Sequence, residues 1–338
     1  MKRILVVNVN WLGDVIFSSP IFKALKEAYP EAHISCLAVP RVKDVLESIP
    51  YVDEIIVYDE KDRHWHPLAK LGLIWKLRCR HFDVAFLLHR SLTRALMVFF
   101  AGIPQRVGYD AKGRGRFLTH QTEPLEGQVH RSNYYLNIFE SYGVKINDRQ
   151  CQLKVLPETE EDVKKVLRSI GIPEDDLVII VNPGGNWDLK RWSPSSYAHL
   201  VAGLVERSNT TVIITGAKKD VSLAKEIIGS GLEKVVDLTG KTNLKQLMAL
   251  MKNADLVISG DSGPLHIADS LGTEVIGLFG PTRPEITGPK GSGWVHIIQK
   301  DLGCNRESCY HLMCPDNVCM QSITVEDVLE LVKQIKDQ

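Results

Sequence analysis

The sequence lacks both a long apolar run and a net charge. Among its 338 residues, Lys and Arg number 41 and Asp and Glu also number 41, so the formal net charge is zero. This balance argues against a general nucleic-acid-binding protein, although a local basic face is compatible with it. No segment reaches the roughly 20 apolar residues that a membrane-spanning helix needs. The apolar run after Met1 is short and leads into Asn8, Asn10 and Asp14 instead of a cleavage site, so we expect a first strand in a cytoplasmic protein.

Two nucleotide-binding signatures are also missing. Neither half contains G-x-G-x-x-G with a downstream ribose carboxylate, which disfavours a dinucleotide-dependent oxidoreductase. The P-loop pattern G-x-x-x-x-G-K-[ST] is absent as well. If the chain binds a nucleotide, it must do so with other loops.

The first half instead alternates apolar strands with helices. A strand over residues 3–9 precedes a helix over 15–28 that Pro20 should kink, and further segments follow at 33–38, 42–49, 54–58, 68–80, 84–88 and 91–101. This alternation is typical of a doubly wound, mostly parallel sheet, in which ligands lie beyond the carboxyl ends of the strands. Asp14 follows the first strand at such an end. Asp14 either caps the helix or contacts a ligand.

Basic residues gather in a glycine-rich stretch after these segments. Such a cluster is either a solvated loop or a pocket for an anionic substrate, because the arginine fork matches phosphates and carboxylates. Its members are Arg90, Arg94, Arg106, Lys112, Arg114, Arg116 and, later, Arg131. A nearby pair, His64 and His66, lacks a third spaced ligand, so we expect a surface loop there.

The second half repeats the pattern with more polar strand ends. A helix over 158–170 precedes a strand over 177–181, which leads into a loop containing Gly184, Gly185 and Lys190. Glycine lets a ligand approach the backbone, and lysine supplies a cation suited to phosphate. The strands at 212–215, 235–238, 256–258 and 274–279 also end in turns with Gly, Lys, Thr or Asp. Several such turns on one sheet edge favour a nucleotide site, so we expect two similar α/β domains facing a cleft.

The stretch from Leu256 to Ala268 carries the clearest signal. Gly260 and Gly263 bracket a turn, and Pro264 is suited to begin a helix that runs to about residue 271. A strand, a turn and a helix start together expose backbone N–H groups, which is a ready anion site. Asp261, Ser262 and His266 would add polar side chains, unless Asp261 or Ser262 merely caps the helix.

These motifs resemble the heptosyltransferases of glycosyltransferase family nine, which build the inner core of bacterial lipopolysaccharide. The resemblance covers nearly the whole chain, and its pattern is closer to members that add the second heptose than to those that add the first. It is carried by Trp11–Val15, Phe99–Gly108, Pro183–Gly185 with Lys190–Trp192, Gly260–Ala268 and Gly280–Thr282.

The resemblance implies the GT-B fold, with two Rossmann-like domains. Residues 1–155 would bind the lipopolysaccharide acceptor, residues 156–322 would bind the ADP-heptose donor, and the helix in 323–338 would pack back across the cleft. The reaction would be an inverting single displacement at the anomeric carbon. It needs a base for the acceptor hydroxyl and help for the departing diphosphate.

Site residues follow from matching the family motifs to this chain. Asp14 would be the base and Lys190 would hold the donor phosphates. Asp261, itself negative, would orient its turn or bind a hydroxyl, and Asp220 would take the ribose hydroxyls. The expected donor set is Gly184, Gly185, Lys190, Asp220, Thr242, Asp261, Ser262, Gly263 and His266. The expected acceptor set is Gly13, Arg90, Arg94, Arg106, Arg114 and Arg116.

The resemblance also sets expectations for metals, partners and location. The sequence contains no Asp-x-Asp, which usually carries the divalent cation in metal-dependent nucleotide-sugar transferases, so no catalytic metal or cofactor is expected. The enzyme would work at the cytoplasmic face of the inner membrane in peripheral contact with it. Two alternatives stay open: a related transferase that uses another nucleotide sugar or glycan acceptor, and a nucleotide-binding module without transfer activity.

Four of the seven cysteines recur at a spacing of five residues near the end of the chain: Cys304, Cys309, Cys314 and Cys319. They could hold a structural metal, either zinc or an iron–sulfur cluster, with His311 as a substitute ligand. Otherwise they are reduced thiols or form disulfides on purification.

Overall fold

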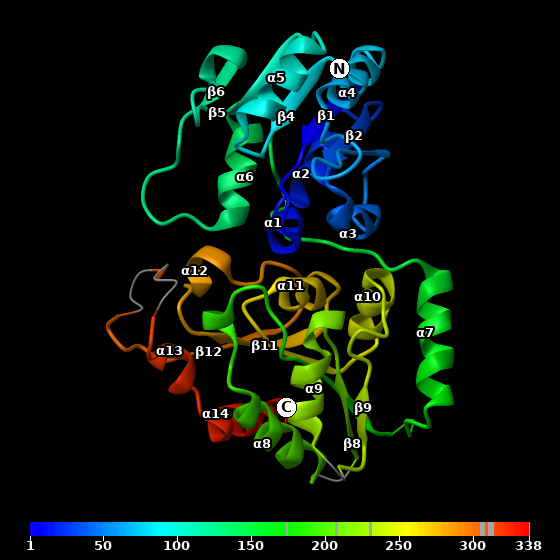
Figure 1. The fold of residues 1–338 in the computed structure, drawn as a ribbon, viewed down its shortest axis with the longest axis vertical. Helices are drawn as coiled ribbons and strands as arrows, with labels where there is room; N and C mark the ends of the chain where they lie inside the picture. The colour runs from blue at the N-terminus through cyan, green and yellow to red at the C-terminus, as the bar shows by residue number, and fades with distance from the viewer. Residues whose placement is uncertain (174, 207–208, 230–231, 305–307, 310–313, 338) are drawn as a thin grey trace. The chain divides into compact units, whose positions relative to one another are not determined.

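The structure is a computed structural model that describes residues 1–337 except 174, 207–208, 230–231, 305–307 and 310–313. The chain divides into two compact units, Met1–Lys154 and Val155–Gln338, here called unit 1 and unit 2 (Figure 1). Each unit is built around one six-stranded parallel sheet.

The sheet of unit 1 has the strand order β3-β2-β1-β4-β5-β6. Its central strands are almost wholly buried, which fits the apolar runs expected of a parallel sheet covered on both faces. The strands are β1 (Arg3–Val7), β2 (His33–Ala38), β3 (Glu54–Val57), β4 (Val84–Leu87), β5 (Gln105–Tyr109) and β6 (His120–Thr122). The helices are α1 (Leu12–Phe17), α2 (Pro20–Ala28), α3 (Lys43–Glu47), α4 (Pro67–Arg78), α5 (Leu92–Phe100) and α6 (Arg131–Glu140).

The sheet of unit 2 has the order β12-β11-β10-β7-β8-β9, which is the same topology. Its strands are β7 (Leu177–Asn182), β8 (Thr210–Ile214), β9 (Val235–Asp237), β10 (Leu256–Gly260), β11 (Glu274–Phe279) and β12 (Val295–Gln299). The helices are α7 (Pro157–Ser169), α8 (Pro194–Val205), α9 (Val221–Ile228), α10 (Leu244–Lys252), α11 (Gly263–Ser270), α12 (Pro284–Thr287), α13 (Val318–Gln321) and α14 (Val325–Lys336).

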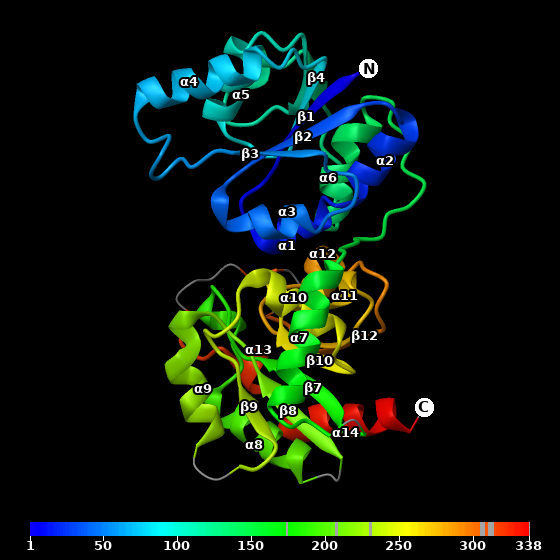
Figure 2. The same cartoon turned by 90° about the vertical axis from the view of Figure 1, so that its right-hand side faces the viewer.

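Helices cover both faces of each sheet (Figure 2). In unit 1, α4 packs beside α5, while α6 packs against α1 and α2. In unit 2, α8 contacts both α9 and α14, and α10 contacts both α7 and α11. Because all strands of a sheet run in one direction, their carboxyl ends meet at one edge. The loops that leave these ends hold the polar motifs of the sequence.

The amino-terminal helix differs from the expected one. A single kinked helix over residues 15–28 was expected, but the chain forms α1 and α2, with a break at Ser18 and Ser19. The Ser18 hydroxyl donates to the carbonyl oxygen of Val15 at 2.7 Å. Pro20 has no N–H to continue the helix, so it begins a new one instead.

The terminal helix α14, expected to pack back across the two halves, buries Val328 and Val332 in the apolar core of unit 2. It contacts α8 in that core. Its start is fixed by a capping box, in which the Thr324 hydroxyl accepts from the N–H of Asp327 and the Asp327 carboxylate accepts from the N–H of Thr324. No helix within the described part of the chain is both long and apolar enough to cross a membrane.

Candidate active site

The loops after β7 and β10 meet at the carboxyl edge of the unit 2 sheet. Lys190, in a short 3-10 turn after β7, places its Nζ 2.6 Å from Oδ2 of Asp261, which follows β10. The backbone allows this approach because residue 260 is glycine. A Cβ at Gly260 would lie 2.9 Å from the carbonyl oxygen of Lys190. The structure therefore brings together two residues that are 71 positions apart in the sequence.

Asp261 is the centre of a buried polar network. Its carboxylate accepts hydrogen bonds from the hydroxyls of Thr282 at 2.6 Å and Thr287 at 3.0 Å, and Nε2 of His266 lies 3.4 Å from Oδ1. Burial alone would raise the pKa of Asp261, but His266 and the positive charge of Lys190 outweigh it and hold that pKa well below its usual range. Asp261 is thus ionised at neutral pH and holds the Lys190 ammonium group through a hydrogen bond.

The helix start beside Asp261 leaves its first backbone N–H groups without a side-chain cap. Ser262 occupies the N-cap position of α11, yet its side chain makes no capping bond. Its hydroxyl instead pairs with that of Ser259 at 3.1 Å. The helix begins at Gly263, one residue before the expected start at Pro264. The Ser262 side chain therefore does not cap this helix, and the uncapped helix start is a geometry that suits an anion.

The loops after β7 and β8 also lie together. A Cβ at Gly184 would be 2.7 Å from Oδ2 of Asp220, so only glycine fits over this carboxylate. Asp220 is buried, and its Oδ2 accepts from the N–H of Ala217 at 3.0 Å. Lys219 donates from Nζ to the carbonyl oxygen of Gly185 at 3.2 Å. Asp220 thus supports the loop beneath Gly184, while Thr242 lies in the loop after β9 at the same edge.

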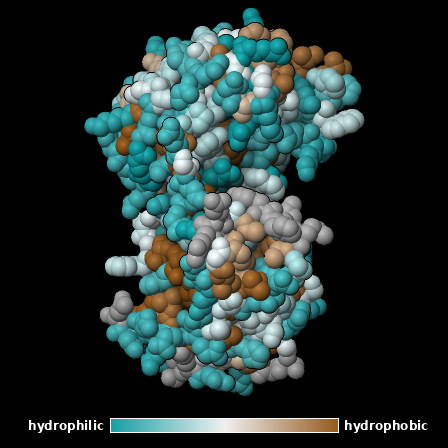
Figure 3. Space-filling view, turned by 90° about the vertical axis from the view of Figure 1, so that its left-hand side faces the viewer, coloured by the Kyte–Doolittle hydropathy of each residue, from teal (hydrophilic) through white to brown (hydrophobic). Residues whose placement is uncertain are grey.

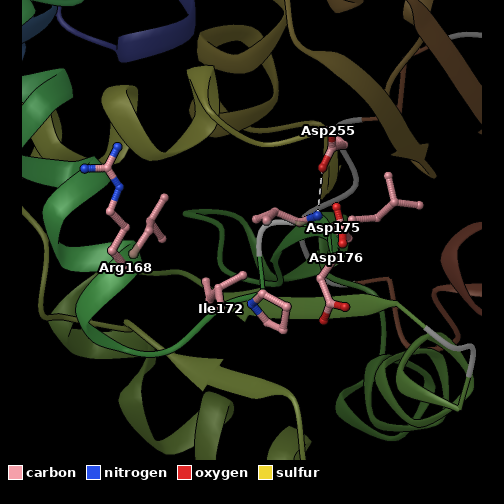
Figure 4. A pocket seen from close by; sticks show the side chains of 9 residues that line it. Arg168, Ile172, Asp175, Asp176 and Asp255 are labelled. Atoms are coloured by element: carbon pink, nitrogen blue, oxygen red, sulfur yellow. Dashed lines mark hydrogen bonds between the residues drawn. The ribbon is translucent and has the colours of Figure 1, made fainter.

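A pocket at the opposite edge of the sheet has the wrong charge for a diphosphate (Figure 4). It has a volume of about 350 Å³ and is lined near the start of β7 by Asp175, Asp176 and Asp255, with Arg168 as its cation. The carboxylate of Asp255 accepts from the N–H of Val178 at 2.8 Å and so helps to hold the strand. Asp176 pairs with Lys234 at 3.2 Å, and the two further carboxylates of this pocket disfavour phosphate oxygens there.

In unit 1, Asp14 lies in the first turn of α1. Its side chain is 20% exposed, and its Oδ1 accepts a hydrogen bond from the Tyr135 hydroxyl at 2.9 Å and lies 3.9 Å from Nε of Arg131. Burial and the Asp14 charge raise the pKa of Tyr135 well above its usual value, so its hydroxyl stays a donor. Both partners come from α6 and approach the same oxygen. The Asp14 side chain is therefore held by another helix and does not merely cap its own.

Three arginines of the expected acceptor set are part of the framework of unit 1. Arg94 and Arg114 are fully buried. Arg94 donates to the carbonyl oxygen of Asn8 at 2.7 Å, and Arg114 donates to that of Tyr109 at 2.8 Å. Arg106 donates to backbone carbonyls in the same way. These guanidinium groups hold loops in place, so the ligand-facing role expected for them is not what the geometry favours. The exposed basic residues of the cluster are Arg90, Lys112 and Arg116.

His89 follows β4 within this basic surrounding and was not expected from the sequence. Its Nδ1 accepts from the N–H of Ser91 at 3.2 Å. Burial, together with the charges of Arg94 and Arg114, lowers the pKa of His89 to about 4. The imidazole is therefore neutral at physiological pH.

This lowered pKa predicts a pH-dependent stability. The unfolded chain takes up a proton at His89 near pH 6.5 and the folded chain only near pH 4, so stability falls by at most about 3 kcal/mol as the pH drops through that window. His89→Gln should remove this contribution to the slope of the unfolding free energy against pH. Urea unfolding between pH 7.5 and 4.5 measures that slope. The exposed His199 provides the control, because His199→Gln should keep the slope of the parent protein. Equal slopes in the parent and His89→Gln proteins would contradict the assignment.

The late cysteines border the loop after β11. Cys304 is exposed, Cys309 and Cys314 are half-buried and Cys319 is buried, all as free thiols. The N–H of Cys309 donates to the carbonyl oxygen of Pro281 at 2.7 Å. Among the described residues, which leave out 305–307 and 310–313, no three His, Cys, Asp or Glu side chains are grouped to hold a metal. His311 lies outside the described residues.

Comparisons with known proteins bear on the family and the fold of the chain. The model of the family described as "Glycosyltransferase family 9 (heptosyltransferase)" matches residues 71–312. The lipooligosaccharide heptosyltransferase 2 of Haemophilus influenzae is 29% identical, over 98% of this chain and 99% of the relative. Two solved structures are each 25% identical to this chain. A family 9 glycosyl transferase from Veillonella parvula has a TM-score of 0.87 and covers 98% of this chain and 96% of its own.

The second solved structure is the ADP-heptose lipopolysaccharide heptosyltransferase II of E. coli, with a TM-score of 0.80 over 99% of this chain and 98% of its own. The likeness spans both parallel sheets, so the expected α/β architecture of the GT-B type is confirmed. With the family match covering well over half of its residues, the chain belongs to glycosyltransferase family 9.

Proposed function

We propose that this glycosyltransferase moves a heptose from ADP-heptose to the inner core of lipopolysaccharide, with inversion at the anomeric carbon. The observation that carries the proposal is the contact between Lys190 and the buried Asp261 beside the uncapped start of α11. This arrangement offers a cation and a row of N–H donors to one diphosphate. The substrate classes come from the names of the relatives, which include a lipopolysaccharide heptosyltransferase 2, a lipooligosaccharide heptosyltransferase 2 and the ADP-heptose enzyme of known structure.

Unit 2 would bind the donor. The backbone N–H groups of Ser262 and Gly263 would donate hydrogen bonds to the diphosphate oxygens, and Lys190 would neutralise their charge. Gly184 and Gly185 would let the nucleotide approach the backbone, and Thr242 and His266 would complete the donor set. Asp220, which supports the loop from below, would reach the ribose through the oxygen that does not bond Ala217.

Asp14 of unit 1 would be the base. Its carboxylate would take the proton of the acceptor hydroxyl while that oxygen forms a bond to the anomeric carbon. The bond from that carbon to the diphosphate oxygen breaks in the same step, and ADP leaves with the electron pair. Tyr135 and Arg131 approach Oδ1, so they would hold the carboxylate in position while Oδ2 receives the proton.

Positive charge for the leaving diphosphate would come from Lys190 and from backbone N–H groups, without a catalytic metal. The acceptor carries phosphates and acidic sugars, which the exposed Arg90, Lys112 and Arg116 would meet near Gly13. The acceptor is anchored in a membrane, so the enzyme would work at the cytoplasmic face of the inner membrane in peripheral contact with it.

A donor and acceptor panel tests the proposal. Purified protein is incubated with ADP-heptose, ADP-glucose or UDP-glucose, and with heptose-deficient lipopolysaccharide as acceptor, and the product is followed by mass spectrometry. We expect the mass of one heptose to be added from ADP-heptose alone. Transfer from another nucleotide sugar would indicate a related transferase. ADP binding without transfer from any donor would indicate a nucleotide-binding module.

A further inference from the structure

Helix α4 of unit 1 is apolar on two faces. Leu73 and Leu77 point into the core of the unit and are nearly fully buried. Leu68, Leu71 and Trp75 recur at spacings of three and four, so they share one face of the helix. Their exposed fractions are 71%, 58% and 69%. Surface helices normally turn their apolar residues inward, so the exposed apolar outer face of α4 calls for an occupant.

The apolar surface extends beyond the helix. Trp65, in the turn before α4, is 70% exposed. On α5, which packs beside α4, Phe99 and Phe100 are also exposed. Figure 2 shows α4 and α5 next to each other at one margin of unit 1, and Figure 3 shows hydrophobic atoms gathered at the upper right margin of the same unit. Tryptophan and leucine in such a surface suit the boundary between lipid head groups and acyl chains.

The charges on this helix all have one sign. Residues Pro67–Arg78 include Lys70, Lys76 and Arg78 but no Asp or Glu. A hollow of about 480 Å³ lies between β3 and α4, and its basic lining residues are Arg63 and Lys76. Cations beside an apolar face complement anionic lipid head groups. A second copy of this surface would instead bring like charges together, because symmetric pairing places each patch against itself.

We propose that this face of α4 docks the protein on an anionic lipid bilayer. We call it the α4 surface and define it by Trp65, Leu68, Leu71, Trp75, Lys76 and Arg78. The apolar side chains enter the head-group boundary, and the two basic side chains pair with lipid phosphates. The α4 surface would be the membrane-contacting surface in the function proposed above. Its role in reaching an anchored acceptor rests on that function, but its binding to lipid does not.

Vesicle co-sedimentation tests the proposal directly. The whole protein is mixed with vesicles of phosphatidylethanolamine and phosphatidylglycerol, or with neutral phosphatidylcholine vesicles, in the absence of sugar substrates. We expect the parent protein to bind the anionic vesicles more tightly. Leu71→Ser with Trp75→Ser should lower the partition coefficient at least about tenfold. Lys76→Gln and Arg78→Gln should each lower it about fivefold at low salt and less at high salt.

The matched control is Trp294, a tryptophan of unit 2 that is 76% exposed outside the α4 surface. Trp294→Ser should leave vesicle binding unchanged. An equal loss of vesicle binding in Trp294→Ser, or unchanged vesicle binding in the Leu71 and Trp75 variant, overturns the proposal. So does a parent protein that sediments as a dimer and becomes monomeric on Leu71→Ser, because a second copy then covers the face.

Transfer to a lipid-free core oligosaccharide is measured on the same proteins. We expect the Leu71 and Trp75 variant to match the parent in this assay, since the α4 surface contains none of the proposed site residues. A parent protein that binds anionic vesicles but transfers no heptose would refute the proposed function and leave the docking surface in place. The reverse result would refute the docking surface alone.

Discussion

Asp14→Asn is expected to slow heptose transfer by about a hundred- to ten-thousandfold, the range that a positioned general base contributes. The amide has nearly the shape of the carboxylate and can still accept the Tyr135 hydroxyl bond, so the fold of unit 1 should survive. It cannot take the acceptor proton. Single-turnover rates with saturating ADP-heptose measure the loss, and calorimetry with ADP should show unchanged affinity because the donor residues belong to unit 2.

The control for this substitution is Asp44, an acidic residue in the first turn of α3 in the same unit. Asp44→Asn changes the same group in a comparable helix position, so it should leave the transfer rate unchanged. Tyr135→Phe keeps the Asp14 carboxylate but removes the hydrogen bond that it accepts. A transfer rate between those of the parent and Asp14→Asn would separate the positioning of the carboxylate from proton transfer. Turnover close to that of the parent in Asp14→Asn would remove Asp14 as the base.

Lys190→Ala is expected to weaken ADP binding about 10- to 100-fold. A charged hydrogen bond contributes about 1.5–3 kcal/mol, which corresponds to this change in affinity. The loss should be larger for ADP than for adenosine, because only ADP carries the diphosphate. Titration calorimetry with both ligands measures the difference. Lys165, an exposed lysine of α7 in the same unit, provides the control, and Lys165→Ala should change ADP affinity little.

Lys190→Ala also removes the contact with Asp261, so the substitution changes stability as well as ADP binding. A second substitution at Asp261 separates the two effects. Without the lysine, the partners of the buried carboxylate within the described residues are His266, Thr282 and Thr287, and the loss should cost about 1–3 kcal/mol of unfolding free energy. Adding Asp261→Asn should restore stability, because no buried charge then lacks its partner. ADP affinity should stay low in the double variant. Recovered affinity there would mean that Lys190 acts only through the fold.

The turns after β7 and β10 could be predicted from sequence because each is local. A buried strand that ends in Gly260 and Asp261, followed by a helix start, exposes backbone N–H groups whatever the rest of the chain does. The same holds for the glycines after β7. Because parallel strands all end on the same side of a sheet, these turns are expected to share one edge.

The contacts within the site depend on long-range packing and could not be predicted. Tyr135 reaches Asp14 from a helix 121 positions away, and no local pattern marks it. The burial of Arg94 and Arg114 has the same origin, because a buried and a solvated arginine look alike in a sequence. The strands β5 and β6 and the helix α6 were also not predicted, because the glycine- and arginine-rich composition around them is typical of loops.

The position of a bound diphosphate tests the central claim most directly. A crystal structure of the protein with ADP should place the diphosphate at the N–H groups of Ser262 and Gly263, with Nζ of Lys190 within hydrogen-bonding distance of a phosphate oxygen. A diphosphate bound elsewhere on unit 2, with Lys190 still paired only with Asp261, would contradict the account.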